Sequence, residues 1–297
     1  MTAILILARA LHFGSCLLLL SIFAVRLLIE PPAEIDASRA RRQARLCQAC
    51  LVVAAGSGFL WLWEAIAGMS GASMMESLSP PLFQMVLTQT PPGQVWLVRS
   101  AIGALLFILL FFPPHRWLWI IGALVAAAFT ASIAWLGHAG AGDDAQRPFM
   151  LAADSLHLCA AALWPVGLIP FAFLLRRQLN ARALPAAHTS VRRFSALSLL
   201  TVSLLAATGL INAWFLVGTL HALVTSAYGR LLIIKITLFA IAVSLGACNL
   251  LVHKPRLDTA PAAMPAMTRK VWIEIALATL IILVVAILGT LPPAIAN

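Results

Sequence analysis

Residues 230–252 read RLLIIKITLFAIAVSLGACNLLV, and Arg230 and Lys235 are the only charged side chains in this run. A helix of about 20 apolar residues is long enough to cross the hydrocarbon core of a bilayer. Comparable runs recur along the chain, which has 297 residues, 62% of them hydrophobic and 10% charged. None of these runs shows the period-two alternation that is typical of membrane-barrel strands. The sequence therefore predicts an all-α, polytopic integral membrane helix bundle, since backbone hydrogen bonds in lipid must be satisfied internally.

We predict eight transmembrane spans, which form a single transmembrane domain over residues 1–297. The predicted spans are residues 3–29, 46–70, 94–112, 117–137, 150–175, 194–217, 230–252 and 271–291. The connections between them are too short to hold a folded domain outside the membrane. The sequence also lacks nucleotide-binding and hydrolase motifs. We therefore expect neither an enzyme nor an ATP-driven pump.

Basic residues are concentrated in the connections that follow the odd-numbered spans. These connections are residues 30–45, 113–116, 176–193 and 253–270. By the positive-inside rule they face the cytoplasm, which places both termini in the periplasm of a bacterium and the chain in its inner membrane. The net charge of +10 then reflects this topology and contact with anionic membrane lipids, and no nucleic acid is expected as a partner.

Polar side chains inside the spans are the candidates for function, because such groups are costly in a bilayer. Met150, Asp154 and His157 follow i, i+4, i+7 spacing and form one stripe on the fifth span. His138 ends the fourth span near the same, outer surface. Imidazole, carboxylate and thioether groups together suit copper, with Asp154 either a ligand or the group that orients His157. We therefore expect His138, Asp154 and His157 to lie within reach of one shared metal ion.

His12 of the first span is a further candidate metal ligand, although Arg9, one turn away, would repel a cation. The alternative for all these residues is a set of buried helix–helix hydrogen bonds or a proton relay. Cys47 and Cys50 form a Cys-x-x-Cys pair at the cytoplasmic start of the second span. They are either soft ligands for Cu(I) or small packing residues, and the sequence leaves both open.

Other buried polar residues suggest pairs between spans. Arg99 and Glu64 lie at similar depth and predict an ion pair. Asn249 and Glu274 both lie near the cytoplasmic side and predict a hydrogen bond. Lys235 lies deeper in the outer half and has no obvious partner.

Several stretches of the chain resemble the CopD family of inner-membrane copper proteins. They are Gly137-His138-Ala139, residues 156–164 (LHLCAAALW), Arg193-Phe194-Ser195, residues 208–214 (TGLINAW) and residues 228–232 (YGRLL), which lead to Lys235 and Asn249. Their order and spacing cover the second half of the chain, and the first half agrees more loosely. The family commonly continues Trp-x-Gly-Gly in the fifth span, whereas this chain has Trp164-Pro165-Val166-Gly167. Pro165 therefore predicts a kink below His157.

The resemblance implies copper transport in copper homeostasis and resistance, with copper import from the periplasm beside a small periplasmic copper carrier of the CopC type. It does not fix the direction of transport. Two alternative functions, each from a different class of protein, also remain open. The first is a b-type membrane cytochrome with haem between His12 and His157. The second is an accessory protein that senses or delivers copper without moving it across the membrane.

Overall fold

The structure is a computed structural model that describes residues 3–32, 36–113, 115–141, 145–254 and 263–296. Within these ranges the chain is helical and has no strand, and eight helical segments are long and apolar enough to cross a bilayer. They are Ala3–Ile29, Ala37–Ser70, Pro91–Leu109, Arg116–Leu136, Arg147–Asn180, Leu184–Val217, Ala227–His253 and Met264–Leu288. The prediction of an all-α membrane bundle with eight spans is confirmed.

Shorter helical turns connect or extend the long helices. In chain order the elements are α1 (Ala3–Ala24), η1 (Val25–Ile29), α2 (Ala37–Ser70), η3 (Glu76–Leu78), α3 (Pro80–Gln89), α4 (Pro91–Leu109), α5 (Arg116–Ala131), η4 (Ser132–Leu136), η5 (His138–Ala141), α6 (Arg147–Leu163), α7 (Leu168–Asn180), α8 (Leu184–Val217), α9 (Leu220–Thr225), α10 (Ala227–Cys248), η6 (Asn249–His253), α11 (Ala263–Leu288) and η8 (Ala294–Ala296).

Three spans begin well before their predicted starts, because the basic segments that precede them are helical. α2 starts at Ala37, α8 at Leu184 and α11 at Ala263. Arginine and alanine are strong helix formers, so these segments extend the apolar helices beyond the bilayer. Asp36 caps α2, since its side chain accepts a hydrogen bond from the Arg39 backbone N–H at 2.7 Å. Sequence hydropathy located the bilayer-spanning part of these helices but not their full length.

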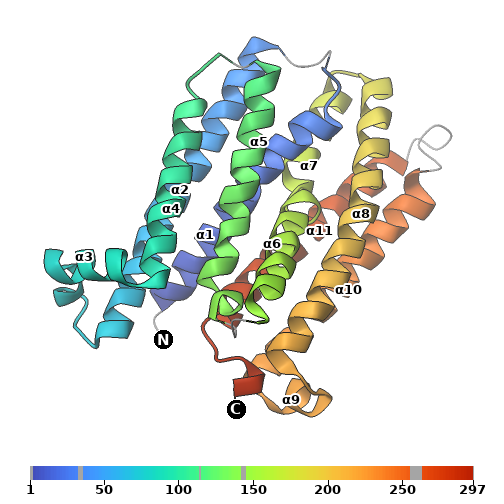
Figure 1. Cartoon of the computed structure of the whole chain (residues 1–297). Coiled ribbons are helices and arrows are strands. Elements are labelled where there is room, and N and C mark those ends of the chain that lie inside the picture. The colour runs from blue at the N-terminus through green and yellow to red at the C-terminus, as the bar shows by residue number, and fades with distance from the viewer. Residues whose placement is uncertain (1–2, 33–35, 114, 142–144, 255–262, 297) are drawn as a thin grey trace.

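Both chain ends lie at one end of the bundle, as an even number of spans requires (Figure 1). The described parts of the basic connections lie at the opposite end, while residues 255–262 of the last one are outside the described ranges. The short helix α3 lies at the side of the bundle, in the half that carries the termini, and runs roughly across the direction of the long helices. The structure thus separates basic connections from termini as predicted, and the assignment of that basic end to the cytoplasm stays a prediction from charge.

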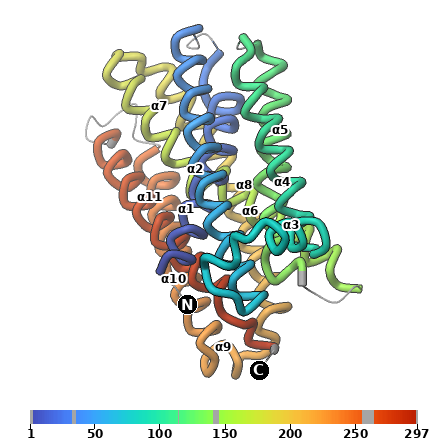
Figure 2. Tube along the Cα trace, turned by 90° about the vertical axis from the view of Figure 1, so that its left-hand side faces the viewer, coloured from blue at the N-terminus to red at the C-terminus, as the bar shows by residue number. Residues whose placement is uncertain are grey.

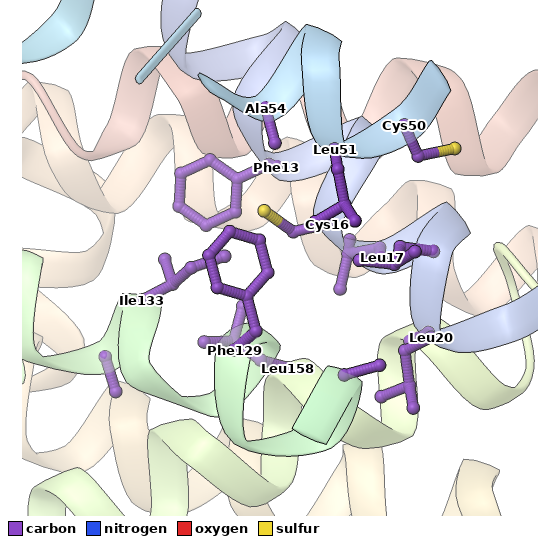
Figure 3. Packing of buried hydrophobic residues seen from close by; sticks show 14 of the residues in the cluster. Phe13, Cys16, Leu17, Leu20, Cys50, Leu51, Ala54, Phe129, Ile133 and Leu158 are labelled. Carbon is purple, nitrogen blue, oxygen red and sulfur yellow. The ribbon is translucent and has the colours of Figure 1, made fainter. Parts of the chain in front are cut away.

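α1 is the central helix of the bundle. It packs against α2, α5, α6 and α11. The view turned by 90° places α10 and α11 on one side and α4 and α5 on the other (Figure 2). Figure 3 shows Cys16 and Leu17 of α1 among Leu51 and Ala54 of α2 and Phe129 of α5. Small and medium side chains on α1 let its neighbours approach closely, which is how helices associate in lipid.

The fifth span is two helices joined by a turn. α6 ends at Leu163 and α7 begins at Leu168, with Trp164-Pro165-Val166-Gly167 between them. Proline has no N–H to donate and its ring clashes with the preceding turn, so a helix does not continue through it. The kink predicted at Pro165 is confirmed, in the form of a short turn that interrupts the α-helix while backbone hydrogen bonds such as Leu168 N–H to the Trp164 carbonyl continue across it. Only α6 carries the predicted ligands of this span.

Glu30 ties three elements together at the basic end of the bundle. Its side chain is fully buried, forms an ion pair with Arg39 of α2, and lies 3.6 Å from Arg177 of α7. Gln43 donates a hydrogen bond to Glu30 Oε2 at 3.2 Å and accepts one from Arg26. A buried carboxylate is stable only with such partners, so this network fixes where the chain turns from η1 into α2.

Replacing Glu30 with alanine should destabilise the protein strongly, because Arg39 and Arg26 lose their buried counter-charge. We expect a loss of about 3 kcal/mol or more in the free energy of unfolding. The control is Arg177→Ala, since that side chain is 44% exposed. Its loss should cost under about 1 kcal/mol. Denaturant unfolding of the purified full-length protein in detergent measures both, and equal losses would rule out Glu30 as the organising group.

Candidate functional site

A cavity of about 180 Å³ lies between α1, α6, α8, α10 and α11, in the half of the bundle that carries the termini. Met150, Asp154 and His157 of α6 line it together, as their spacing predicts, and His138 of η5 lines it as well. Four of the five predicted ligands therefore face one cavity. Gly209 of α8 leaves room for the imidazole, since a Cβ added there would lie 3.4 Å from His157 Cε1.

His157 keeps one ring nitrogen available on the cavity side. The Thr208 hydroxyl donates to the Leu204 carbonyl at 2.6 Å, so its oxygen can accept from His157 Nδ1 at 2.9 Å. This assignment places the ring proton on Nδ1 and leaves a lone pair on Nε2. Nε2 lies 3.5 Å from Lys235 Nζ. An imidazole oriented through Nδ1 is the usual form of a metal-ligating histidine, but here Nε2 can accept a hydrogen bond from Lys235.

His138 also has an uncommitted ring nitrogen. Its Nε2 is buried and has no hydrogen-bond partner in the part of the chain that the structure describes. Its ring lies edge-on to Tyr228, with 6.0 Å between the centroids. Burial lowers the pKa of His138, and the charge of Arg9 lowers it further. The imidazole is therefore neutral at physiological pH, which is the form that binds a metal ion.

Asp154 is held from two sides. Asn212 of α8 donates a hydrogen bond to Asp154 Oδ1 at 3.1 Å, and Lys235 of α10 faces the carboxylate electrostatically. Lys235, for which the sequence suggested no partner, therefore lies between Asp154 and His157. Arg9 of α1 adds a second positive charge to the cavity lining. The cavity thus holds two fixed cations and one carboxylate in addition to the histidines.

These side chains share a cavity without meeting at ligand distance. Within the described residues, no group of three or more His, Cys, Asp and Glu side chains has the geometry to hold a metal ion. The expectation that His138, Asp154 and His157 lie within ligand-sharing reach is not met in this structure. The lysine beside His157 Nε2 is one physical reason, since a metal ion and an ammonium group cannot share that lone pair.

His12 lies apart from the other predicted ligands. The Ala54 carbonyl can only accept, so His12 Nδ1 donates to it, at 2.9 Å. His12 Nε2 then accepts from Arg99 Nη2 at 2.7 Å. The ring is 1% exposed and lies edge-on to Trp61 and Trp96. Both ring nitrogens form hydrogen bonds within the protein, which favours a structural role for His12 over that of a metal or haem ligand.

The other predicted pairs had mixed outcomes. Asn249 Nδ2 donates to Glu274 Oε1 at 2.9 Å, which confirms that pair. Arg99 does not take Glu64 as its partner, because its guanidinium binds His12, the Phe129 carbonyl at 2.8 Å and the Ser132 hydroxyl at 2.5 Å. The Cys16 sulfur is a fourth acceptor, at 3.8 Å from Arg99 Nη2. The sequence placed Arg99 correctly inside the bundle but did not show that uncharged acceptors would surround it.

Cys47 and Cys50 are free thiols buried in the core between α1 and α2. That packing fits the alternative in which they are small apolar side chains.

Thr208 and Tyr228 are site residues that reasoning from the residues alone did not select. Thr208 and Asn212 are four residues apart on α8 and share a face of that helix. This spacing is the sequence signal that could have identified Thr208 as a neighbour of the site.

The architecture defines a multi-pass membrane protein whose polar site is a cavity inside the bundle. Residues 1–148 match the family described as "Copper resistance protein D-like, N-terminal domain", and residues 188–288 match "Copper resistance protein D". The chain belongs to the CopD family of copper resistance proteins.

Curated relatives agree with this assignment. The chain is 29% identical over 237 residues to "Copper resistance protein D" of Pseudomonas syringae pv. tomato, which covers 76% of each chain. It is 28% identical over 289 residues to "Inner membrane protein YebZ" of Escherichia coli (strain K12), covering 96% of this chain and 97% of that protein. It is 26% identical over 236 residues to "Copper transport protein CutJ" of Bacillus subtilis (strain 168), covering 75% of this chain but 41% of that longer protein. No solved structure matches the chain.

Replacing His12 with alanine should affect stability and leave metal binding unchanged. The change removes the acceptor for Arg99 Nη2 and the donor to the Ala54 carbonyl, which should cost about 1–3 kcal/mol of unfolding free energy. Copper retained by the purified protein should equal that of the wild type. Loss of copper at unchanged stability would show that His12 is a ligand after all.

Proposed function

We propose that this protein binds copper in the cavity between α1, α6, α8, α10 and α11 and moves it across the bacterial inner membrane. Copper is the substrate, and we propose no enzymatic reaction. The observation that carries the proposal is that His138 and His157 line one cavity with Met150 and Asp154. His138 Nε2 is buried without a hydrogen-bond partner among the described residues, and His157 Nε2 has only Lys235 Nζ, at 3.5 Å, as its neighbour. Relatives named for copper resistance and for copper transport support it.

The residues present suit transient copper binding. Imidazole and thioether groups are good ligands for copper, and a carboxylate favours its oxidised form. For copper to reach His157 Nε2, Lys235 must withdraw from its position 3.5 Å away. Arg9 and Lys235 also repel a cation in the cavity. Binding is thereby weakened, and weak binding is what a transport pathway needs in order to release its ion.

We further propose that copper moves from the periplasm to the cytoplasm in copper homeostasis and resistance. The positive-inside rule places the cavity in the periplasmic half, so copper would reach it first from that side. A small periplasmic carrier of the CopC type would meet the protein at the end that bears α3 and α9 (Figure 1). The relative from Escherichia coli named as an inner membrane protein supports the location.

The cytochrome reading is not favoured by the geometry. It requires His12 and His157 as a pair of axial ligands. His12 donates and accepts hydrogen bonds through both ring nitrogens and lines a cavity different from that of His157. A Soret band in the purified protein would nevertheless restore that reading.

Replacing His157 or His138 with alanine should abolish copper uptake, since each change removes an available imidazole nitrogen. We expect uptake into proteoliposomes to fall at least about tenfold. His221→Ala is the matched control, because His221 is exposed on α9 at the same end of the bundle. Normal uptake by both cavity variants would refute the transport proposal. Copper binding without uptake in the wild type would instead identify an accessory protein that senses or delivers copper.

Replacing Lys235 with methionine should tighten copper binding and slow its release. The change removes the ammonium group beside His157 Nε2 and leaves Asp154 without its cationic neighbour. Equilibrium dialysis should show higher copper affinity, and proteoliposomes should show slower turnover. Thr237→Ala is the control, because Thr237 is an exposed residue of the same helix. Unchanged affinity in Lys235→Met would exclude Lys235 as the group that weakens binding.

A further inference from the structure

A second cavity lies in the half of the bundle that bears the basic connections. It has a volume of about 140 Å³ and is lined by residues of α7, α8, α10, η6 and α11. Its lining is mostly apolar, and its polar residues are Ser195, Ser198, Asn249 and Glu274. None of the residues that line it also lines the cavity around His157. The copper proposal makes no use of this cavity.

Glu274 of α11 is a buried carboxylate at the edge of this cavity. It is 2% exposed, and Asn249 donates to its Oε1 at 2.9 Å. Its Oε2 lies beside Gly246, where an added Cβ would be 3.4 Å away. Lys270, one turn earlier on α11, donates to Cys248 Sγ at 2.6 Å. Among the described residues, no cationic group lies within salt-bridge distance of Glu274. A charge buried in this way needs a counter-ion or a proton.

Asn249 supplies a second unsatisfied oxygen. Its Oδ1 is buried and has no hydrogen-bond partner in the described chain, although its Nδ2 is bound to Glu274. The helix also changes at this residue, because α10 ends at Cys248 and the π-helix η6 starts at Asn249. π-Helical turns occur frequently at functional sites. Two oxygen acceptors on neighbouring helices therefore border one cavity, and no cationic side chain of the described chain forms a salt bridge with Glu274, although Lys270 acts on it electrostatically.

We propose that Glu274 and Asn249 bind a small monovalent cation, Na⁺ or a proton, in this second cavity. Oxygen atoms are hard ligands and favour such ions over copper, which prefers nitrogen and sulfur. One carboxylate balances one positive charge. A proton would sit between Glu274 and Asn249 with the amide turned so that Oδ1 accepts it. For Na⁺, the remaining ligands would be water, for which the cavity has room at about 30 Å³ per molecule.

The two cavities lie one above the other along α10. Lys235 lines the first cavity and Asn249 the second, roughly 20 Å apart at about 1.5 Å per residue. Phe239 lies between these two residues along the chain, and its ring packs edge-on against Trp164 of the second cavity, with 5.9 Å between ring centroids. The cation site is therefore physically separate from the copper cavity. Cation binding can be measured without copper, so its failure would leave the copper proposal untouched.

The charged surroundings of Glu274 are simple enough to test by titration. Lys270 on its own helix and Cys248 of α10 are the titratable groups that lie near it. The residues that α7 and α8 contribute to the cavity carry apolar side chains and the hydroxyls of Ser195 and Ser198. A cation- or pH-dependent signal that requires Glu274 can therefore be assigned to this site.

The experiment is thermal unfolding of the purified full-length protein, freed of copper by a chelator. Sodium chloride is compared with choline chloride at constant ionic strength over a series of pH values. If Na⁺ binds, the midpoint rises with the logarithm of its concentration above saturation. If a proton binds instead, the midpoint falls as pH rises and sodium has no effect. Glu274→Gln should abolish either response, because the neutral amide neither balances the charge of a cation nor takes up a proton.

Two further variants protect the test from misfolding and from indirect effects. Asn249→Leu keeps the volume but removes Oδ1, and should reduce the same response if Glu274→Gln does not fold. Ser244→Ala is the control, since Ser244 is exposed on α10 and bonds only within its own helix, to the Ala240 carbonyl at 2.8 Å. Absence of a sodium response together with equal pH dependence in wild type and variants would overturn the proposal.

Discussion

A polar group packed between the helices of this bundle is shielded from bulk water, so it is satisfied chiefly by another part of the chain. That constraint explains why α1 is central. Arg9 on one side of it donates to the Ala286 carbonyl and stacks over Trp61, while His12 on another side joins the Ala54 carbonyl to Arg99. Helices from both halves of the chain are held against α1 by bonds that lipid cannot replace.

The same constraint distinguishes structural polar groups from functional ones. His12 and Arg99 have their hydrogen-bonding groups largely satisfied within the protein and stabilise contacts between α1, α2, α4 and α5. His138 Nε2 and Asn249 Oδ1 are buried without partners in the described chain, and each borders a cavity. A buried polar atom that the protein leaves unsatisfied carries a free-energy cost, which a bound ion can recover. On this view, the candidate functional sites of this bundle are the buried polar atoms that have no hydrogen-bond partner among the described residues.

The two cavities differ in their chemistry. The one around His157 offers nitrogen, sulfur and one carboxylate, with Lys235 and Arg9 limiting how tightly a cation binds. The one around Glu274 offers the oxygens of Glu274, Asn249 and two serines with a single thioether, that of Met267, and no fixed cation is among the described residues that line it. A soft or borderline metal suits the first and a hard monovalent ion suits the second. The break at Pro165 lies near the level that separates them, so α6 and α7 each serve a different cavity.

The spans, and the stripe of Met150, Asp154 and His157, follow from the sequence itself. Hydrophobic length decides whether a helix crosses the bilayer, and the 3.6-residue period decides which side chains share a face. The sequence also predicted a kink at Pro165, where the structure has a turn between two helices, and the Asn249–Glu274 bond. Which faces meet was decided only by the tertiary structure. His12 and His157 are both histidines inside a span, and the sequence does not distinguish them. In the structure Arg99 binds His12 Nε2 at 2.7 Å, whereas Lys235 lies 3.5 Å from His157 Nε2. Such pairings depend on the rotation and register of helices far apart in sequence, and no local pattern encodes them.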